Sequence, residues 1–399
     1  MKEFSKRATM VAPSLTLAIT AQANKLKSEG VDVVGFTAGE PDFNTPEYIN
    51  NAAREAIDKG FTKYTPASGT MELKKAICAK LLKDNGLTYS PQQIVVSGGA
   101  KQSIYNALQI LVEDGDEVII ISPYWLTYPE LVKVNGGKPV VVDALATNGF
   151  KVLPKDIEKV ITSKTKAVIF NSPNNPTGAV YNRSEIEALM EVFIKYDLWI
   201  ISDEIYEKLV YNGATHVSVA SINAEAYKRT FVVNGMSKAY AMTGWRIGYI
   251  AAPNAESAKY MGALQSHQTS NPNSIAQYAS VTALNGGEDI IAEMVNRFAI
   301  RRNLMLNELK TVKYVTAVEG EGAFYVMVDV TKLFGKNIKG TVANTALEMA
   351  AVLLDKCGVA VIPCESFGAD GYIRLSYTLS DCDIVKGIGR MRDLFNDVL

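Results

Sequence analysis

Residues 234–248, NGMSKAYAMTGWRIG, combine a lysine and an arginine in a spacing that suits carbonyl and phosphate chemistry. Lys238 lies just beyond the β-branched run 230–233, and Arg246 follows eight residues later between two glycines. A lysine that is partly desolvated in a crevice has a lowered pKa and can attack a carbonyl, whereas an arginine near backbone amides suits a phosphate. One lysine alone is usually a solvated surface group, so the prediction depends on the whole segment.

Two other strand-like runs also end in polar side chains. Asp203 and Tyr206 follow the run 198–202 in the motif DEIY, and Asn175 belongs to the turn NSPNNPTG after the run 166–170. A carboxylate at the carboxyl end of a buried strand needs a partner, although Asp203 is also interpretable as a helix N-cap. The Asn-Pro turn by itself names no ligand. Ligands of open α/β sheets bind beyond the carboxyl ends of the strands, so these residues are candidates for one site.

Seven short apolar runs are the elements that must position these residues. Because they do not alternate with polar residues, they predict strands buried on both faces of a mostly parallel sheet, with helices between them. One such helix is expected at 184–196, where Ser184 and Glu187 have the spacing of a capping box. The seven runs are 93–96, 117–121, 139–142, 166–170, 198–202, 230–233 and 247–251.

The C-terminal part of the chain has a different pattern. A long amphipathic helix is expected at about 287–309, followed by short strands such as 323–330 and 372–376. This pattern predicts a second, α+β domain. An N-terminal helix at about 14–28 is expected to pack with it.

Composition excludes several classes of protein. The 399 residues are 48% hydrophobic and 21% charged with a net charge of -1, so neither a disordered chain nor a nucleic-acid-binding or membrane-surface protein is expected. No run reaches the roughly 18 apolar residues of a membrane helix, and no apolar secretory signal is present, which favours the cytoplasm. Four cysteines without C-x-x-C spacing and two histidines, His216 and His267, interpreted as surface or loop residues, predict no metal site.

The segment 234–248 resembles the pyridoxal-phosphate attachment site of the class I aminotransferases, in which G-x-S-K leads to R-I-G. Five further motifs of that family are present in the family's order. They are AGEPDF (38–43), SPYW (122–125), NNPTG (174–178), DEIY (203–206) and IRLSY (373–377). The resemblance covers nearly the whole chain and is closest to bacterial-type aspartate aminotransferases, a branch that also contains prephenate-using enzymes.

The resemblance implies the α/β fold of the fold type I pyridoxal-phosphate-dependent transferases. Residues 46–288 would form a large domain with a mostly parallel seven-stranded sheet. Residues 1–45 and 289–399 would form a smaller α+β domain. The resemblance also implies a homodimer whose two subunits share their active sites.

The same resemblance implies roles around the cofactor, pyridoxal 5'-phosphate. Lys238 should hold it covalently and then move the substrate's α-proton as a general base. Asp203 should pair with the protonated pyridine nitrogen, which keeps the ring an electron sink. Tyr206 and Asn175 should hydrogen-bond the ring oxygen, and Trp125 should stack on the ring.

The cofactor's phosphate is expected on the glycine-rich loop 97–101, which runs into a predicted helix N-terminus. Relatives often carry a serine three residues before the lysine. Here that residue is Gly235, so we expect Ser237 to take its place. The expected contacts in this region are Gly99, Ala100, Lys101, Ser237, Arg246 and, from the neighbouring subunit, Tyr64.

Substrate recognition is expected to use two cations. Arg374 should clamp the α-carboxylate bidentately, a geometry that lysine cannot copy. Animal-type enzymes bind the distal carboxylate with an arginine, but the comparable loop 265–274 has none, so Lys101 with Thr16 is expected there. Lys101 is equally interpretable as a phosphate cation or a surface lysine. The expected substrate contacts are Gly39, Trp125, Asn175, Arg374, Lys101 and Thr16.

The resulting hypothesis is an aminotransferase that moves an amino group from L-aspartate to 2-oxoglutarate by a ping-pong mechanism through pyridoxamine phosphate. Its partners are then small amino acids and 2-oxo acids. Prephenate use is not expected, because Ala12 stands where prephenate-using members tend to have lysine. An aromatic or alanine aminotransferase and a β-lyase are alternatives on the same scaffold. A ligand-sensing regulator would need an extra N-terminal module, and a nicotinamide dehydrogenase would need a G-x-G-x-x-G motif after an early strand.

Overall fold

The computed structural model describes residues 2–396 and residue 398, and its centre is a seven-stranded sheet. The strand order is β2-β8-β7-β6-β5-β3-β4; β8 is antiparallel to both neighbours and the other pairs are parallel. All seven predicted strands are present, with ends shifted by one or two residues. They are β2 (Ile94–Ser97), β3 (Glu117–Ser122), β4 (Lys138–Asp143), β5 (Thr165–Asn171), β6 (Trp199–Asp203), β7 (Thr230–Gly235) and β8 (Gly248–Ala251).

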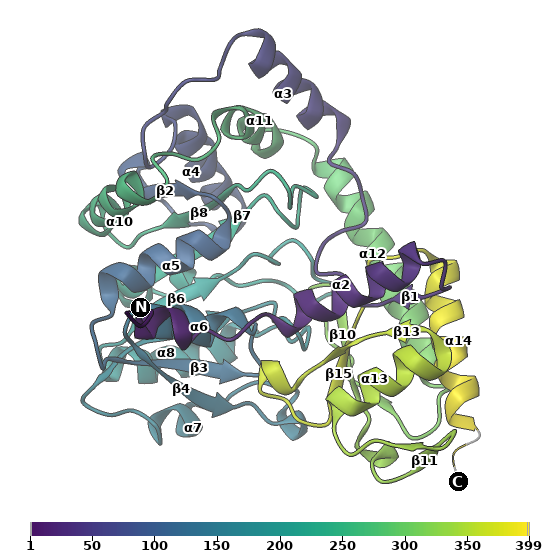
Figure 1. Ribbon diagram of the computed structural model, residues 1–399. Coiled ribbons are helices and arrows are strands. Elements are labelled where there is room, and N and C mark those ends of the chain that lie inside the picture. The colour runs from purple at the N-terminus through teal and green to yellow at the C-terminus, as the bar shows by residue number, and fades with distance from the viewer. Residues whose placement is uncertain (1, 397, 399) are drawn as a thin grey trace.

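Helices cover both faces of this sheet, as the apolar runs predict (Figure 1). Along β5, Ala167 and Ile169 belong to the core under one helical layer, while Val168 and Phe170 belong to the core under the other, because strand side chains alternate. The first layer contains α5 (Ala100–Leu111), α6 (Thr127–Val134) and α10 (Ala255–Gln268). The second contains α7 (Pro154–Glu158), α8 (Arg183–Lys195) and α9 (Ala224–Arg229).

Three further helices cover the second face of the sheet at its β2–β8 end. Their buried apolar side chains form one cluster with Ile94 and Val96 of β2, whereas Val95 between them belongs to the core under the first layer. In Figure 1 they form the upper end of the molecule. They are α3 (Glu47–Asp58), α4 (Met71–Asn85) and α11 (Ser274–Leu284).

The predicted start of α8 is wrong. The N-cap is Asn182, whose side chain accepts from the backbone N–H of Glu185 at 3.0 Å, while the Glu185 carboxylate accepts from the backbone N–H of Asn182 at 2.7 Å. Asparagine caps a helix as well as serine does, and the capping-box spacing of Asn182 and Glu185 overrides that of Ser184 and Glu187. Ser184 lies inside the helix and donates its hydroxyl to Asn182 at 2.8 Å.

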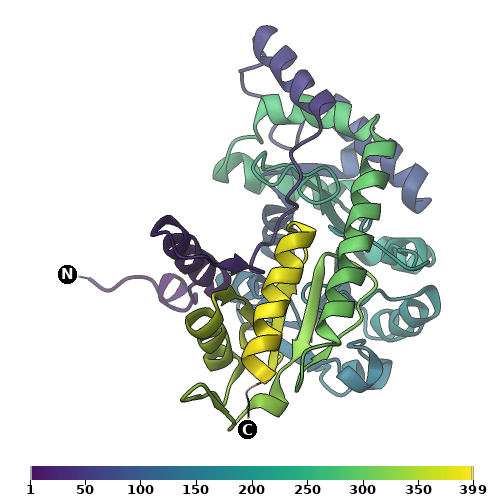
Figure 2. The same cartoon turned by 90° about the vertical axis from the view of Figure 1, so that its right-hand side faces the viewer.

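A second sheet lies beside the first, with strand order β14-β15-β10-β9 and antiparallel pairing throughout. The long helix α12 (Glu288–Leu309) and the C-terminal helix α14 (Asp381–Asn396) run side by side against it and share its apolar core (Figure 2). The strands are β9 (Thr316–Ala317), β10 (Tyr325–Asp329), β14 (Ile362–Pro363) and β15 (Tyr372–Ser376); α13 (Ala346–Cys357) also packs there.

The N-terminal segment packs against both parts of the molecule. Helix α1 (Lys6–Thr9) lies beside α6, and α2 (Leu15–Ser28) packs near a small parallel pair formed by β1 (Val34–Gly35) and β13 (Val359–Ala360) (Figure 1). A two-strand hairpin, β11 (Asn337–Ile338) and β12 (Thr341–Val342), completes the strands of the described chain. We propose that 46–288 is the large domain and that 1–45 with 289–399 is the small one.

The chain shows neither a membrane span nor a disulfide in its described part. None of the helices described is long and apolar enough to cross a bilayer. The four cysteines, which all lie in that part, are free thiols, and Cys364 is fully buried.

Candidate active site

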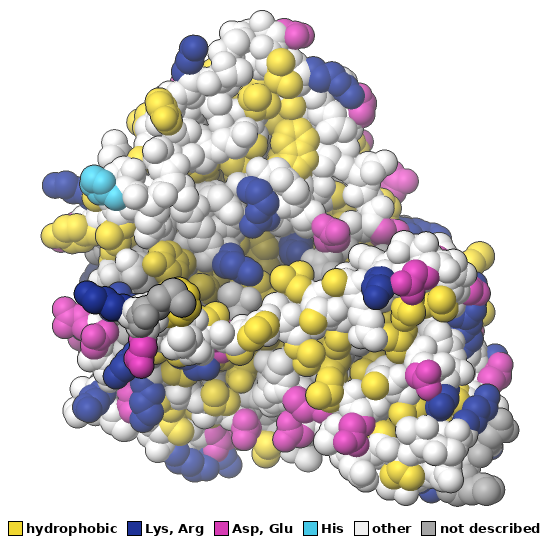
Figure 3. Space-filling view, in the orientation of Figure 1, with side chains coloured by type: hydrophobic (Ala, Val, Ile, Leu, Met, Phe, Trp, Pro, Cys, Tyr) yellow, Lys and Arg dark blue, Asp and Glu magenta, His cyan; other side chains and the backbone are white. Residues whose placement is uncertain are grey.

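A cavity of about 690 Å³ lies at the carboxyl ends of β5, β6 and β7 and is bounded on its other side by the small domain. In the space-filling view, this face is hollowed between its two lobes, and basic side chains gather in the hollow (Figure 3). The predicted residues that line it are Thr16, Gly39, Ala100, Lys101, Trp125, Asn175, Asp203, Tyr206, Ser237, Lys238, Arg246 and Arg374.

Two predicted residues do not line the cavity of this chain. Gly99 is the N-cap of α5 and directly precedes Ala100, which does line the cavity. Tyr64 is 89% exposed, so within one chain its hydroxyl has no access to the site. Its assigned role requires a second subunit, and that role remains a proposal.

Lys238 presents its amine to the floor of the cavity just beyond β7. The amine donates to the carbonyl of Gly39 at 2.5 Å and lies 5.8 Å and 5.5 Å from the ring centres of Tyr206 and Phe324. Burial lowers the pKa of Lys238 to about 8; the nearby Glu40 carboxylate opposes this shift. The amine is therefore partly neutral near neutral pH, as a nucleophile or base must be.

Position 235 requires a glycine because β7 and β8 lie very close together there. Gly235 pairs with Gly248, and a Cβ on Gly235 would lie 2.9 Å from the Cα of Gly248 and from the carbonyl oxygen of Ile247. The serine that relatives often carry here would need the strands to move apart. Ser237 lines the cavity two residues later.

Asp203 is a buried carboxylate at the end of β6. One oxygen accepts the hydroxyl of Tyr128 at 2.7 Å, and the other accepts the backbone N–H of Ile205 at 3.2 Å. Burial raises the pKa of Asp203 to about 6, although both hydrogen bonds act to lower it. A cationic group in the cavity would remove this desolvation cost. The helix N-cap interpretation fails because no helix begins after Asp203.

The start of α5 forms a cradle for an anion. Gly99 has a φ of +99°, a conformation that suits glycine, and a Cβ there would collide with the guanidinium of Arg246. Arg246 donates to the carbonyls of Gly98 at 3.2 Å and Thr243 at 2.7 Å. The backbone amides of Ala100 and Lys101, for which the described chain supplies no acceptor, and this guanidinium together suit a phosphate.

Arg374 is the largest fully buried side chain in this region, at 2% exposure. Its two terminal nitrogens donate to the side-chain oxygen of Asn175 at 3.0 Å and to the carbonyl of Thr37 at 3.3 Å, while its Nε has no partner among the described residues. A buried guanidinium with unused donors at a cavity suits a carboxylate ligand. Thr16 also has a buried hydroxyl that is unpartnered within the described residues.

Lys101 lies at the mouth of the same cavity. Its ammonium is 4.9 Å from the ring centre of Trp125, and burial, together with the charge of Arg246, lowers its pKa. Lys101 follows Ala100 of the phosphate cradle and lines the same cavity as Arg374. The geometry is therefore compatible with a contact to the phosphate and with a contact to the distal carboxylate of the substrate.

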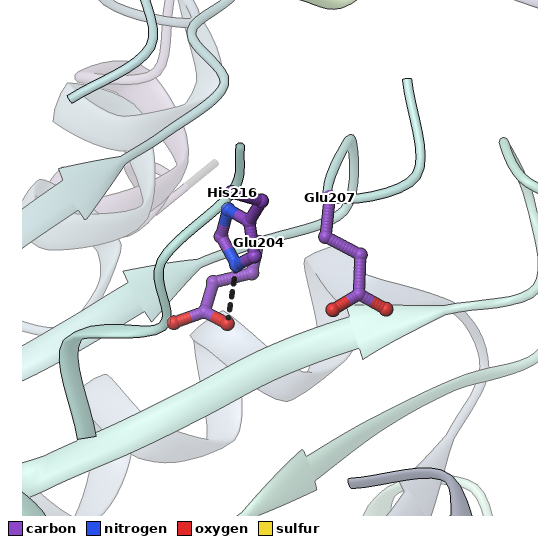
Figure 4. Close-up of side chains that lie close together, drawn as sticks. All are labelled: Glu204, Glu207 and His216. Carbon is purple, nitrogen blue, oxygen red and sulfur yellow. Dashed lines mark hydrogen bonds and ion pairs between the residues drawn. The ribbon is translucent and has the colours of Figure 1, made fainter. Parts of the chain in front are cut away.

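A buried charge network begins at Glu204, the residue that follows Asp203, and Figure 4 shows it with Glu207 and His216. Glu204 accepts hydrogen bonds from Ser202 and Ser218, each at 2.8 Å, and pairs with His216 at 3.1 Å. His216 lies in a loop, which is one of the two positions expected for it, but it is not a surface residue, because its side chain is only 7% exposed. Burial acts to lower the pKa of His216, but Glu204 outweighs it and raises the pKa.

The same network contains Glu207, whose carboxylate pairs with the ammonium of Lys80 on α4. Ligand atoms of Glu204, Glu207 and His216 lie within 4.8 Å of one another, an arrangement compatible with a metal ion. Lys80 already supplies the positive charge to Glu207, so we interpret the cluster as an internal salt-bridge network. It fixes the segment that carries Asp203 and Tyr206.

Two tyrosines of the cavity that contact predicted site residues were missed by the sequence analysis. Tyr128 on α6 bonds Asp203, and Tyr325 on β10 lies between Tyr206 and Arg374. The motif SPYW ends three residues before Tyr128. The sequence offered no further indication that Tyr128 belongs to the site. Tyr325 lies in the predicted strand 323–330, where an aromatic residue is expected to be part of the core.

Comparison with known proteins identifies a family that matches this chain over most of its length. A family model described as aminotransferase class I and II matches residues 31–390. An aspartate aminotransferase of Bacillus sp. (strain YM-2) is 46% identical over 98% of this chain and 99% of its own length. An aspartate/prephenate aminotransferase of Cereibacter sphaeroides is 48% identical over 93% of both chains.

Solved structures agree with the sequence comparison. The aspartate aminotransferase of Thermus thermophilus with maleate superimposes with a TM-score of 0.93 at 41% identity, covering 99% of this chain and all of the other. The aspartate aminotransferase of Rhizobium meliloti gives a TM-score of 0.96 at 40% identity over the whole of both chains.

Proposed function

The chain belongs to the class I and II aminotransferases, which depend on pyridoxal phosphate, and we propose that it transfers the amino group of L-aspartate to 2-oxoglutarate. The names of its relatives support this choice of substrate. The observation that carries the proposal is that Arg374 and Lys101 line the same cavity, in addition to Lys238 and Arg246, which we assign to the cofactor. A dicarboxylic amino acid satisfies both, whereas a neutral one leaves Lys101 without a partner.

The cavity fits pyridoxal phosphate in its charges and in its shape. The cradle at Gly99 and Arg246 suits the phosphate, and the buried carboxylate of Asp203 lacks the cation that a protonated ring nitrogen would supply. Lys238 offers the amine for covalent attachment. The proposed cofactor contacts are Lys238, Gly99, Ala100, Lys101, Trp125, Asn175, Asp203, Tyr206, Ser237, Arg246 and the partner's Tyr64.

When bound, pyridoxal phosphate supplies a carbonyl that takes up the amino group and a ring that accepts the electron pair released at Cα. The protein's own residues do the remaining work. Arg374 orients the α-carboxylate through the donors it does not spend on Asn175 and Thr37. Lys238, with its pKa near 8, accepts the α-proton and returns it. The small domain and α2 bound the cavity and limit water.

Initial-rate kinetics test the proposal. With aspartate varied at several fixed concentrations of 2-oxoglutarate, double-reciprocal plots should give parallel lines, because the enzyme holds the amino group between two half-reactions. Oxaloacetate and glutamate should appear in equal amounts. Intersecting lines would contradict the ping-pong order. The β-lyase alternative is tested separately: release of a thiol, pyruvate and ammonia from a cystathionine-like substrate would indicate elimination instead of transfer. Lys238→Ala is the control that should abolish transfer.

We also propose a cytoplasmic homodimer in which Tyr64 completes the partner's site. The 89% exposure of Tyr64 supports the proposed dimer, because a large aromatic side chain is seldom so exposed unless it contacts another subunit. We do not expect prephenate to serve as an acceptor, since the side chain of Ala12 offers no charge for its second carboxylate. Turnover of prephenate at a rate comparable with 2-oxoglutarate would contradict this.

A further inference from the structure

Tyr325 connects two residues of the proposed site that come from different parts of the fold. It is the first residue of β10 in the small domain and is 2% exposed. Its hydroxyl lies 3.1 Å from the hydroxyl of Tyr206, which follows β6 of the large sheet. Its ring centre lies 4.2 Å from the guanidinium carbon of Arg374, on the neighbouring strand β15.

The hydroxyl contact has a consequence for the proton of Tyr206. Burial raises the pKa values of both phenols, so each stays protonated and one must donate to the other. If Tyr325 donates, the proton of Tyr206 is free to point into the cavity. Gly39 lies beside the Tyr325 hydroxyl, where an added Cβ would come within 3.6 Å of it. Among the described side chains, the hydrogen-bond partner of this hydroxyl is Tyr206.

The ring contact has a consequence for Arg374. The guanidinium carbon lies 4.2 Å from the ring centre of Tyr325 and 5.2 Å from that of Phe367. Two neighbouring aromatic rings stabilise a cation with few hydrogen bonds and restrict its rotation. The plane of the guanidinium is thereby fixed, and its edge is left for a carboxylate.

We propose that Tyr325 is a positioning residue with two separable roles: its hydroxyl orients the phenol of Tyr206 toward the bound cofactor, and its ring orients Arg374 toward the substrate carboxylate. The inference rests on the proposed function, because it takes Tyr206 and Arg374 as ligand contacts. It adds that one side chain of the small domain sets the geometry of both the cofactor and the carboxylate contacts.

Two substitutions separate the roles in the holoenzyme. Tyr325→Phe removes only the hydroxyl, and Tyr325→Leu removes the ring as well. The control is Tyr211→Phe, because Tyr211 is also buried and donates its hydroxyl to the carbonyl of Ala323 at 2.6 Å but does not line the cavity. Melting temperature and circular dichroism establish that each variant is folded.

The hydroxyl role is measured by a spectral titration. We expect the pH midpoint of the cofactor's visible absorption to rise by about 0.5–1 unit in Tyr325→Phe, because a misdirected Tyr206 no longer stabilises the ionised ring oxygen. Affinity for maleate, an unreactive dicarboxylate, should change less than about twofold in that variant, since the ring remains. An unmoved midpoint would overturn the hydroxyl role, and an equal shift in Tyr211→Phe would overturn it as well.

The ring role is measured by the dissociation constant for maleate. Tyr325→Leu should weaken binding between roughly threefold and thirtyfold, the range of a buried cation–π contact. Phe367→Leu, which removes the more distant ring, should weaken binding without moving the spectral midpoint, and it carries the test if Tyr325→Leu does not fold. Unchanged maleate affinity in every folded leucine variant would overturn the ring role. Failure of the unmutated enzyme to use aspartate, with these shifts present, would overturn the proposed function and support the role of Tyr325.

Discussion

Lys238 and Arg374 present two cations to one cavity but are held in different ways. The amine of Lys238 has one backbone acceptor and a pKa lowered to about 8 by burial, so it can lose its proton. Arg374 is enclosed by Asn175, Thr37 and two aromatic rings and serves as a permanent charge. Lys238 was predicted from its position just after a strand, whereas Arg374 was predicted only through the family resemblance. The contacts of Tyr128 with Asp203 and of Tyr325 with Arg374 could not be predicted, because they join residues far apart in the chain.

The lowered pKa of Lys238 can be measured in the cofactor-free protein. The residue should react with a small acylating reagent with an apparent pKa of about 8, so that about half of its amines are reactive at pH 8, when ordinary lysines near pKa 10.4 are almost fully protonated. Peptide mass spectrometry gives the rate at each lysine. Lys259 on α10 serves as the internal control, since it does not line the cavity. Equal rates at both residues across pH 7–10 would contradict the assigned environment.

At the scale of elements, the strands were easier to predict than the ends of the helices. Strands buried on both faces produce apolar runs that mark their positions to within a residue or two. The start of α8 was wrong because two overlapping capping spacings are present and only the packed helix selects between them. The Glu204–Glu207–His216 network was also missed, because its cation, Lys80, comes from α4, more than a hundred residues earlier.

The network predicts a specific cost for losing Lys80. Lys80→Met leaves Glu207 buried without its cation and should lower the free energy of unfolding by about 3–5 kcal/mol. Lys83→Met is the matched control on the same helix: its pair with Glu288 is exposed, so it should cost no more than about 1 kcal/mol. Urea denaturation measures both. Equal costs would show that the network is not a structural support.

The same network predicts a pH dependence with a definite sign. Burial acts to raise the pKa of Glu207, but the charges of Lys80 and His216 outweigh it and lower the pKa to about 2, from an ordinary value of 4.5. Its contribution to stability is therefore complete above about pH 4.5 and is lost as the pH falls toward 2. Lys80→Met should lose less stability than the unmutated protein over this range. Parallel curves would contradict the ion pair.

At the scale of the whole molecule, the site is assembled from both ends of the chain. Gly39 precedes the large domain, Lys238 lies near its end, and Arg374 belongs to the second sheet. The order of motifs along the sequence predicted this assembly through resemblance, while periodicity alone gave only two domains. The hydroxyl pair of Tyr206 and Tyr325 joins the two parts directly.

Shared active sites predict complementation between inactive subunits. A Tyr64→Ala chain and a Lys238→Ala chain should each have little activity at limiting cofactor. In a mixed dimer, one site receives its Lys238 from the first chain and its Tyr64 from the second, so that site should recover activity. Mixing after reversible dissociation, followed by an activity assay, measures this. No recovery in verified mixed dimers would contradict the proposed contact of Tyr64 with the partner's site.

The central claim is an amino-group transfer that prefers acidic amino acids, and the most direct test is the visible spectrum of the holoenzyme during addition of single amino acids without any 2-oxo acid. The cofactor band should fall with aspartate and glutamate at concentrations well below those needed for alanine or phenylalanine. In Lys238→Ala the amino acid can still condense with the cofactor's aldehyde, but no pyridoxamine phosphate should form, because the base that moves the α-proton is missing. A response to aromatic or neutral amino acids alone would contradict the role of Lys101. No response to any amino acid would contradict the proposed amino-group transfer itself, including the role of Lys238.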